Sequence, residues 1–260
     1  MYKIFRYTLS DLLRNRWLII YTLFYLALTI GLLYLTNDFT KVAVSLSNIT
    51  LILAPLIGLL YGIMYYYNSN EYLTFLLAQP VSRRTVLTGF ILGIAVSLSL
   101  SILIGIGVPY AIFGQADHIQ LATFFLVLGM SIVLTIVFAF ISVVVGLLHN
   151  NRIKGFGAAI FIWLFFAVIY DGLFLLLLLF FKDYPLEKAT LFLTMSNPID
   201  LARILILMKL DISAIMGYTG AVLEEFLGKT NGSIAIFVVL FFWVSVPFLY
   251  AQKIIRKKDF

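Results

Sequence analysis

Cysteine is absent from the 260 residues of this chain, and histidine occurs only twice. Without cysteine there is no disulfide and no thiolate metal or redox site, so we expect no bound metal. Charged residues make up 12% of the chain, against about 25% in soluble domains. The sequence has no GxxxxGK(S/T), HExxH, GxSxG or CxxC pattern, so we expect no catalytic residues and no cofactor bound by this chain.

Hydrophobic residues are what the chain has instead: 63% of the total, with a mean hydropathy of +1.07. A membrane-spanning helix needs about 20 mostly apolar residues. Six stretches qualify, and they are continuous rather than alternating, which excludes strands: 17–36, 48–67, 88–113, 121–148, 156–181 and 233–251. The sequence therefore predicts a single all-α domain, 1–260, that spans the membrane several times.

Basic residues indicate which way the spans run, because Lys and Arg near span ends are retained in the cytoplasm. If both termini are cytoplasmic, that side holds 12 of the 18 basic residues: Lys3, Arg6, Arg14, Arg16, Arg83, Arg84, Arg152, Lys154, Lys253, Arg256, Lys257 and Lys258. The short outer loops hold only Lys41. We expect cytoplasmic termini and attribute the pI near 9.4 to contact with anionic lipid, not nucleic acid.

The N-terminal segment, 1–16, is predicted to be an amphipathic elbow helix in the headgroup plane. Its apolar and polar faces would be formed by Phe5, Leu9, Leu12 and Leu13 on one side and Lys3, Arg6, Ser10 and Arg14 on the other. Two interpretations fit: a generic basic anchor, or an elbow that couples cytoplasmic motion to the first span.

Residues 71–87 form a polar interruption between the second and third spans. They begin with Glu71, continue through apolar positions that include Phe75, and break at Gln79-Pro80. Ser82 is placed to cap the next helix, which starts with Arg83 and Arg84. A short amphipathic helix between two spans is typical of a docking element.

Asp171, preceded by Tyr170, is the one formal charge predicted to lie within a span. An intramembrane carboxylate is costly and is a functional candidate by default. Our hypothesis is that Asp171 lines a polar, outward-facing cavity. The structural alternative is a protonated carboxyl, or one satisfied by a Tyr or Ser hydroxyl.

Residues 182–232 are too long for a simple turn and are predicted to form a helical periplasmic subdomain that meets a partner. Asn197 and Pro198 are a good helix start, with Asp200 and Arg203 in the turns that follow. A second helical piece is expected from Ile212 to Phe226. Three methionines in or beside these helices suit either Cu(I) binding or apolar packing: Met195, Met208 and Met216.

This architecture resembles the ABC-2-type transporter permeases over essentially the whole chain. The similar features are the six spans, the amphipathic N-terminal helix and the pattern LLAQPVSRR after the second span. Within that family, three stretches look most like the permeases of nitrous oxide reductase maturation: Leu9 to Trp17, Tyr170-Asp171 and Asn197 to Arg203.

The resemblance implies a homodimer in the bacterial inner membrane, with two copies of a cytoplasmic ABC ATPase below it and a periplasmic repeat protein above it. ATP and Mg would be bound by the ATPase. By position, the coupling residues would be Glu71, Phe75, Gln79, Pro80, Ser82, Arg83 and Arg84. The periplasmic contact would involve Asn197, Pro198, Asp200 and Arg203. The implied role is transport of a sulfur species, or mechanical action on the periplasmic partner, during copper-sulfur site assembly.

Two other functions remain open at this point. A general ABC-2 exporter of a lipid, drug or polysaccharide would share every feature except the outer segment Asn197 to Arg203. A non-transporting membrane scaffold is the second alternative, and it predicts that disrupting residues 71–87 leaves an associated ATPase unaffected.

Overall fold

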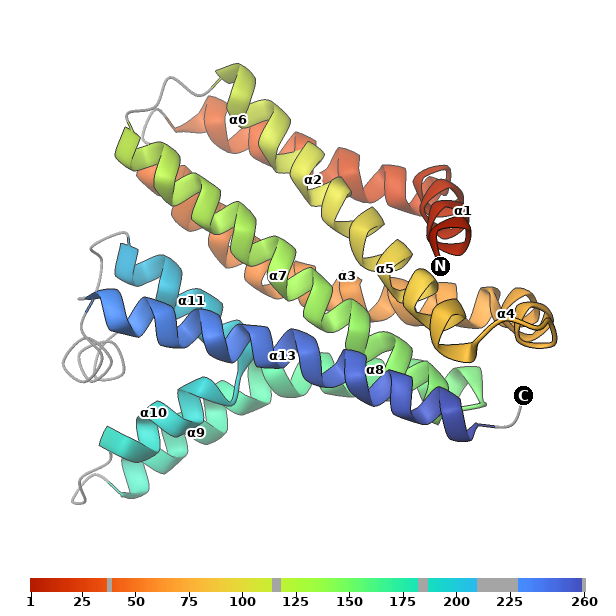
Figure 1. The fold of residues 1–260 in the computed structure, drawn as a ribbon. Helices are drawn as coiled ribbons and strands as arrows, with labels where there is room; N and C mark the ends of the chain where they lie inside the picture. The colour runs from red at the N-terminus through yellow and green to blue at the C-terminus, as the bar shows by residue number, and fades with distance from the viewer. Residues whose placement is uncertain (37–38, 114–117, 182–186, 210–228, 259–260) are drawn as a thin grey trace.

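The computed structural model describes residues 1–36, 39–113, 118–181, 187–209 and 229–258, and these are helical apart from short turns. Among them are six helices long and apolar enough to cross a membrane, and one bent pair, Ala189–Met195 with Pro198–Leu207, would make a seventh span if it were counted as one. This confirms the predicted all-α, six-span fold. Both termini lie at one end of the bundle, together with the short helix α4 (Figure 1). We call this end, formed by residues 1–16, 69–83, 149–152 and 257–258, the termini face.

The six spans follow the predicted hydrophobic runs and extend beyond several of them. They are α2 (Arg16–Leu35), α3 (Phe39–Asn68), α5 (Arg83–Ile102) with α6 (Val108–Phe113), α7 (His118–Leu148), α8 (Arg152–Leu164) with α9 (Tyr170–Phe180), and α13 (Lys229–Lys257). The second begins nine residues before the predicted residue 48 because its polar side chains bond back to the helix. Ser47 Oγ donates to the Val44 carbonyl at 2.8 Å.

Two of the spans contain a π-helical stretch, Leu103–Gly107 in the third and Phe165–Ile169 in the fifth. In the third span the stretch ends just before Pro109, which has no N–H to offer the preceding turn. The wider π turn accommodates that missing donor. Pro55, in contrast, lies inside the continuous helix α3.

Helices α3, α5 and α7 form the core, and α7 crosses its centre (Figure 1). Glycines allow close approach at specific places. A Cβ at Gly58 would lie 3.2 Å from the Thr135 carbonyl oxygen of α7. On the third span, a Cβ at Gly93 would meet Thr8 of α1, whereas one at Gly105, in the π-helical stretch, would meet Tyr25 of α2. Small residues on the third span therefore admit two different partner helices.

The elbow segment is the helix α1 (Tyr2–Leu13), and it packs on α5 at the termini face. Its buried residues are Ile4, Thr8 and Leu12. Of the predicted apolar face, Leu12 is buried against the bundle, whereas Leu13 is 41% exposed and faces outward. The reason is that Gly89 and Gly93 leave a groove on α5 that accepts Ile4 and the small Thr8, and this contact sets the rotation of α1.

Between the fifth and sixth spans, α10 (Glu187–Met195) and α11 (Pro198–Lys209) meet at an angle of 106°. Helix α11 packs against α3, α7 and α13, with Leu201, Ala202 and Leu205 fully buried. This part of the predicted subdomain therefore lies against the bundle. The predicted helix from Ile212 to Phe226 lies outside the described residues, as does Met216; the side chain of Met208 is not described either.

Candidate functional site

Helix α4 (Asn70–Leu77) lies on the termini face and contains the first predicted coupling residues. Glu71 is in its first turn, where a carboxylate interacts favourably with the helix dipole. Leu73 is only 2% exposed and anchors the helix. Phe75, two residues on, is 64% exposed. Helix α4 is therefore held mainly by Leu73, with Leu76 and Leu77 also packed against the core, and presents an aromatic and an acidic side chain outward.

The chain then turns at Gln79-Pro80 and restarts as α5. Ser82 caps that helix, since its Oγ accepts a hydrogen bond from the Thr85 N–H at 3.4 Å. Arg83 donates from Nη1 to the Lys258 carbonyl at 2.8 Å, which ties the start of α5 to the end of the chain. The structure brings the seven predicted coupling residues to one surface, and all seven are exposed: Glu71, Phe75, Gln79, Pro80, Ser82, Arg83 and Arg84.

Helix α4 also touches the elbow helix directly. The rings of Tyr7 on α1 and Tyr72 on α4 lie 4.7 Å apart between centroids, at an interplanar angle of 31°. Burial, with the nearby Tyr7 and Asp11 as lesser causes, raises the pKa of Tyr72 above its ordinary value. Asp11 itself accepts a hydrogen bond from the Tyr65 hydroxyl at 2.9 Å. The elbow is thus bound to both α4 and the end of α3.

Sequence reasoning missed the three consecutive tyrosines at the end of α3. Tyr65 bonds to Asp11 of the elbow, whereas Tyr67 donates to the His149 carbonyl at 2.7 Å in the turn between α7 and α8. Tyr66 packs against Gly146 of α7. A run of tyrosines just before a polar loop is typical of a membrane interface, and that pattern was the available signal.

A second polar cluster joins the fifth span to α11. Arg203 Nη1 lies 2.9 Å from Asp171 Oδ2 and 3.2 Å from Asp200 Oδ1. The sequence predicted Asp171 and the Asn197 to Arg203 segment as two separate sites, and the structure makes them one. Asp171 is paired with an arginine, where the structural alternative had a Tyr or Ser hydroxyl. Side chains of both Asp171 and Arg203 are 35% exposed.

Asn197 supports this cluster from within. It is fully buried, and its Oδ1 accepts from the Ile199 N–H at 3.0 Å, which caps α11 as predicted. Its Nδ2 donates to Asp200 Oδ2 at 2.9 Å and to the Phe166 carbonyl at 3.0 Å. Phe166 belongs to the π-helical stretch of the fifth span, where the wide turn leaves a carbonyl available. The π turn and the helix cap are therefore a single structural unit.

Two further side chains hold the break between α10 and α11. The Tyr170 hydroxyl donates to the Leu193 carbonyl at 2.6 Å, and Trp243 Nε1 on α13 donates to the Met195 carbonyl at 3.3 Å. Of the four residues predicted to contact a periplasmic partner, Asn197 and Pro198 are buried, whereas Asp200 and Arg203 are partly exposed. That contact stays a prediction.

Comparison with known proteins gives an independent line of evidence. The family model described as "ABC-2 family transporter protein" matches residues 40–255. The chain is 27% identical over 274 residues to the probable ABC transporter permease protein NosY of Pseudomonas aeruginosa, with 99% of this chain and 98% of that protein covered. It is 28% identical over 276 residues to the protein of the same name from Stutzerimonas stutzeri, with the same coverage.

Proposed function

Since the chain belongs to the ABC-2 family of transporter proteins, as a NosY-like permease subunit, we propose that it works as a homodimer driven by a separate ATPase. ATP and Mg are bound by that NosF-like ATPase and not by this chain. The protein resides in a bacterial inner membrane with both termini in the cytoplasm. The shared location of the termini and α4 at one end supports this orientation, as does the basic-residue pattern.

The observation that carries the proposal is the exposed surface formed by α4 and the start of α5. Phe75 offers a large apolar contact, with Glu71 and Arg84 offering charges of both signs beside it. Behind this surface, the Tyr7–Tyr72 ring contact leads to the elbow helix. A push on α4 from the ATPase therefore reaches the first span through α1, which favours the coupling interpretation of the elbow over the generic anchor.

For the cargo, we combine what the sequence resemblance implies with the donor chemistry of the chain. We assign to this chain a role in copper-sulfur site assembly of nitrous oxide reductase, with a NosD-like periplasmic repeat protein as partner. The absence of cysteine and the presence of only two histidines disfavour a relay of bare copper ions. Movement of a sulfur species, or mechanical action on the periplasmic partner, fits this composition better.

An apolar groove supports a second candidate, export of a lipid-like molecule. The groove has a volume of about 540 Å³. It lies between α2, α3 and α8 and is lined by residues that include Phe24, Ile57 and Phe156. A groove of this kind accepts an acyl chain or another apolar body. This candidate would be favoured if deletion of the whole chain abolished export of such a molecule and left growth on nitrous oxide unchanged.

The test of the proposed coupling is the double substitution Arg83→Glu with Arg84→Glu. Charge reversal on the exposed surface is expected to lower co-purification of the ATPase, and ATP hydrolysis by the complex, by about tenfold, because like charges then face the partner. The matched control is Lys253→Glu, an exposed basic residue on α13. Retained assembly and retained hydrolysis in the double variant would count against coupling and in favour of a passive scaffold.

Mass spectrometry of the proteins that co-purify with the wild-type chain distinguishes the two cargo classes. An ATPase together with a periplasmic repeat protein is the result expected for copper-sulfur site assembly. An ATPase alone would shift the assignment to an exporter, and absence of an ATPase would overturn the coupling proposal.

A further inference from the structure

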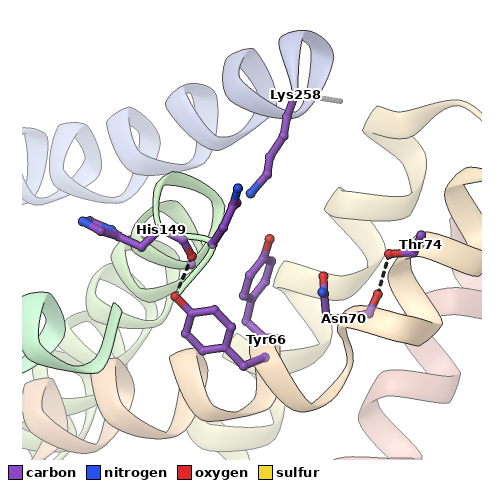
Figure 2. Close-up of a pocket in the computed structure, with 8 residues that line it drawn as sticks. Tyr66, Asn70, Thr74, His149 and Lys258 are labelled. Atoms are coloured by element: carbon purple, nitrogen blue, oxygen red, sulfur yellow. Dashed lines mark hydrogen bonds between the residues drawn. The ribbon is translucent and has the colours of Figure 1, made fainter. Parts of the chain in front are cut away.

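A polar cavity of about 230 Å³ opens on the termini face, beside the coupling helix (Figure 2). Four chain segments form it: the end of α3, the helix α4, the turn between α7 and α8, and the end of the chain. The side chains that matter for its chemistry are Tyr66, Asn70, Thr74, Asn150 and Lys258. These residues come from segments far apart in the sequence, and the fold alone brings them together.

Tyr66 contributes a hydroxyl group to the lining of the cavity. The residue is only 2% exposed, and its hydroxyl has no hydrogen-bond partner among the residues that the structure describes. Figure 2 shows the hydroxyl pointing into the cavity, toward the side chain of Lys258. The Tyr66 hydroxyl therefore lines the cavity and is available to donate a hydrogen bond to a group bound there.

The charge of the cavity indicates what that group is. Lys258 Nζ is held at the cavity by a hydrogen bond of 2.7 Å to the Leu147 carbonyl. Burial lowers the pKa of Lys258 from its ordinary value, and a bound anion would offset that effect. None of the described lining residues carries a carboxylate. The cavity is therefore suited to an anion and unsuited to a metal cation.

From this arrangement we propose that the cavity binds a phosphate group. A hydroxyl, two carboxamides and an ammonium approach it from different segments, and a tetrahedral anion with several acceptor oxygens matches donors on several sides better than a planar carboxylate does. The phosphate belongs either to a phospholipid headgroup, since the cavity lies at the end of the spans, or to a soluble phosphate. This proposal does not depend on the ATPase-coupling function.

Binding here has a structural consequence for the coupling helix. The phosphate bridges Asn70 of α4 to Tyr66 of α3 and to Lys258 at the chain end. Since α4 is otherwise attached through Leu73 and through the Tyr7–Tyr72 ring contact, the bridge adds a further attachment. A bound phosphate thus stiffens the connection between α4 and the spans.

The experiment is a thermal unfolding titration of the full chain, purified in detergent with its bound partners and followed by tryptophan fluorescence. Two probes separate the sources: inorganic phosphate at constant ionic strength, and dioctanoyl phosphatidic acid compared with dioctanoylglycerol. We expect a saturable rise in Tm with at least one phosphate probe and none with dioctanoylglycerol. A response to inorganic phosphate identifies a soluble anion, and a response to phosphatidic acid alone identifies a lipid headgroup.

Variants link the response to the cavity. Lys258→Gln should weaken the apparent affinity by about tenfold, and Tyr66→Phe, which removes one oxygen and keeps the ring, by about threefold. The neighbouring exposed Lys257→Gln is the matched control and should stay within about twofold. No saturable response to either phosphate probe, or equal weakening in Lys257→Gln and Lys258→Gln, would overturn the proposal. If Lys258→Gln fails to fold, an unchanged affinity in Tyr66→Phe overturns it.

Discussion

At the scale of single residues, the most consequential side chain is Arg203, because it serves two carboxylates. Asp171 comes from the fifth span and Asp200 from the same helix as Arg203. Removal of one carboxylate leaves the arginine with the other. Removal of the arginine leaves two carboxylates beside each other in a region of low dielectric, which is the costlier state. The three residues are therefore not equivalent in their contribution to stability.

We predict that Arg203→Gln lowers the free energy of unfolding by about 1–3 kcal/mol, which is less than for a fully buried pair because both partners are partly exposed. Asp171→Asn should have a smaller effect. The double variant Asp171→Asn with Arg203→Gln should recover part of the loss, since only one carboxylate then remains. Thermal unfolding of all three variants in the same detergent measures this order. If Asp171→Asn is the most destabilising of the three, the pairing is wrong.

At the scale of elements, contacts at the termini face connect the elbow, α4 and two of the spans. The elbow lies on α5 where Gly89 and Gly93 admit it, and it reaches α4 through Tyr7 and Tyr72. Tyr65 and Tyr67 extend the same connection to the elbow and to the α7–α8 turn. The end of α3 thus contacts both the elbow helix α1 and the α7–α8 turn.

We predict that Gly93→Ala loosens the elbow. The added methyl group would lie 2.5 Å from Thr8 Cγ2, so α1 must shift, at a cost of about 1–3 kcal/mol. The matched control is Gly31→Ala in α2, where nothing lies within 4 Å and the change is expected to be neutral or slightly stabilising. Protease cleavage within residues 1–16 of the folded protein reports the loosening. Equal cleavage of the two variants would contradict the role of the Gly93 contact.

At the scale of the whole molecule, the arrangement of the helices places the ends of the chain and α4 at one end of the bundle (Figure 1). Helices α2 and α9 end on the opposite side, with Leu35 84% and Phe180 78% exposed. Many apolar side chains of α2, α8, α9 and α13 face outward. Their exposure is expected in a membrane protein, because they contact lipid and not water.

The orientation is open to direct measurement because the chain has no native cysteine to give a background signal. We predict that Leu35→Cys and Phe180→Cys react with a membrane-impermeant maleimide in intact spheroplasts. Ser82→Cys and Lys257→Cys should react only after the membrane is opened, since they lie on the termini face. The reverse pattern would place both termini outside and would rule out an ATPase docked at α4.

Hydropathy, basic-residue placement and capping residues were enough to predict the spans, the α4 region and the two helix starts at Ser82 and Asn197. These are properties of neighbouring residues along the chain, and a helix needs only local bonds to satisfy its backbone in lipid. The rotation of the elbow was not predictable in this way. Its apolar residues permit more than one buried face, and the glycines of a helix distant in sequence select among them.

The sequence alone therefore determined that this protein is a helical membrane protein with a polar element between its second and third spans. Only the tertiary structure decided that Asp171 pairs with Arg203, 32 positions away, and that Tyr66 and Lys258 face one cavity. The physical reason is that charge pairing and cavity formation depend on which helix faces meet. In lipid, apolar faces do not distinguish one neighbour from another, so small residues and polar contacts make that choice.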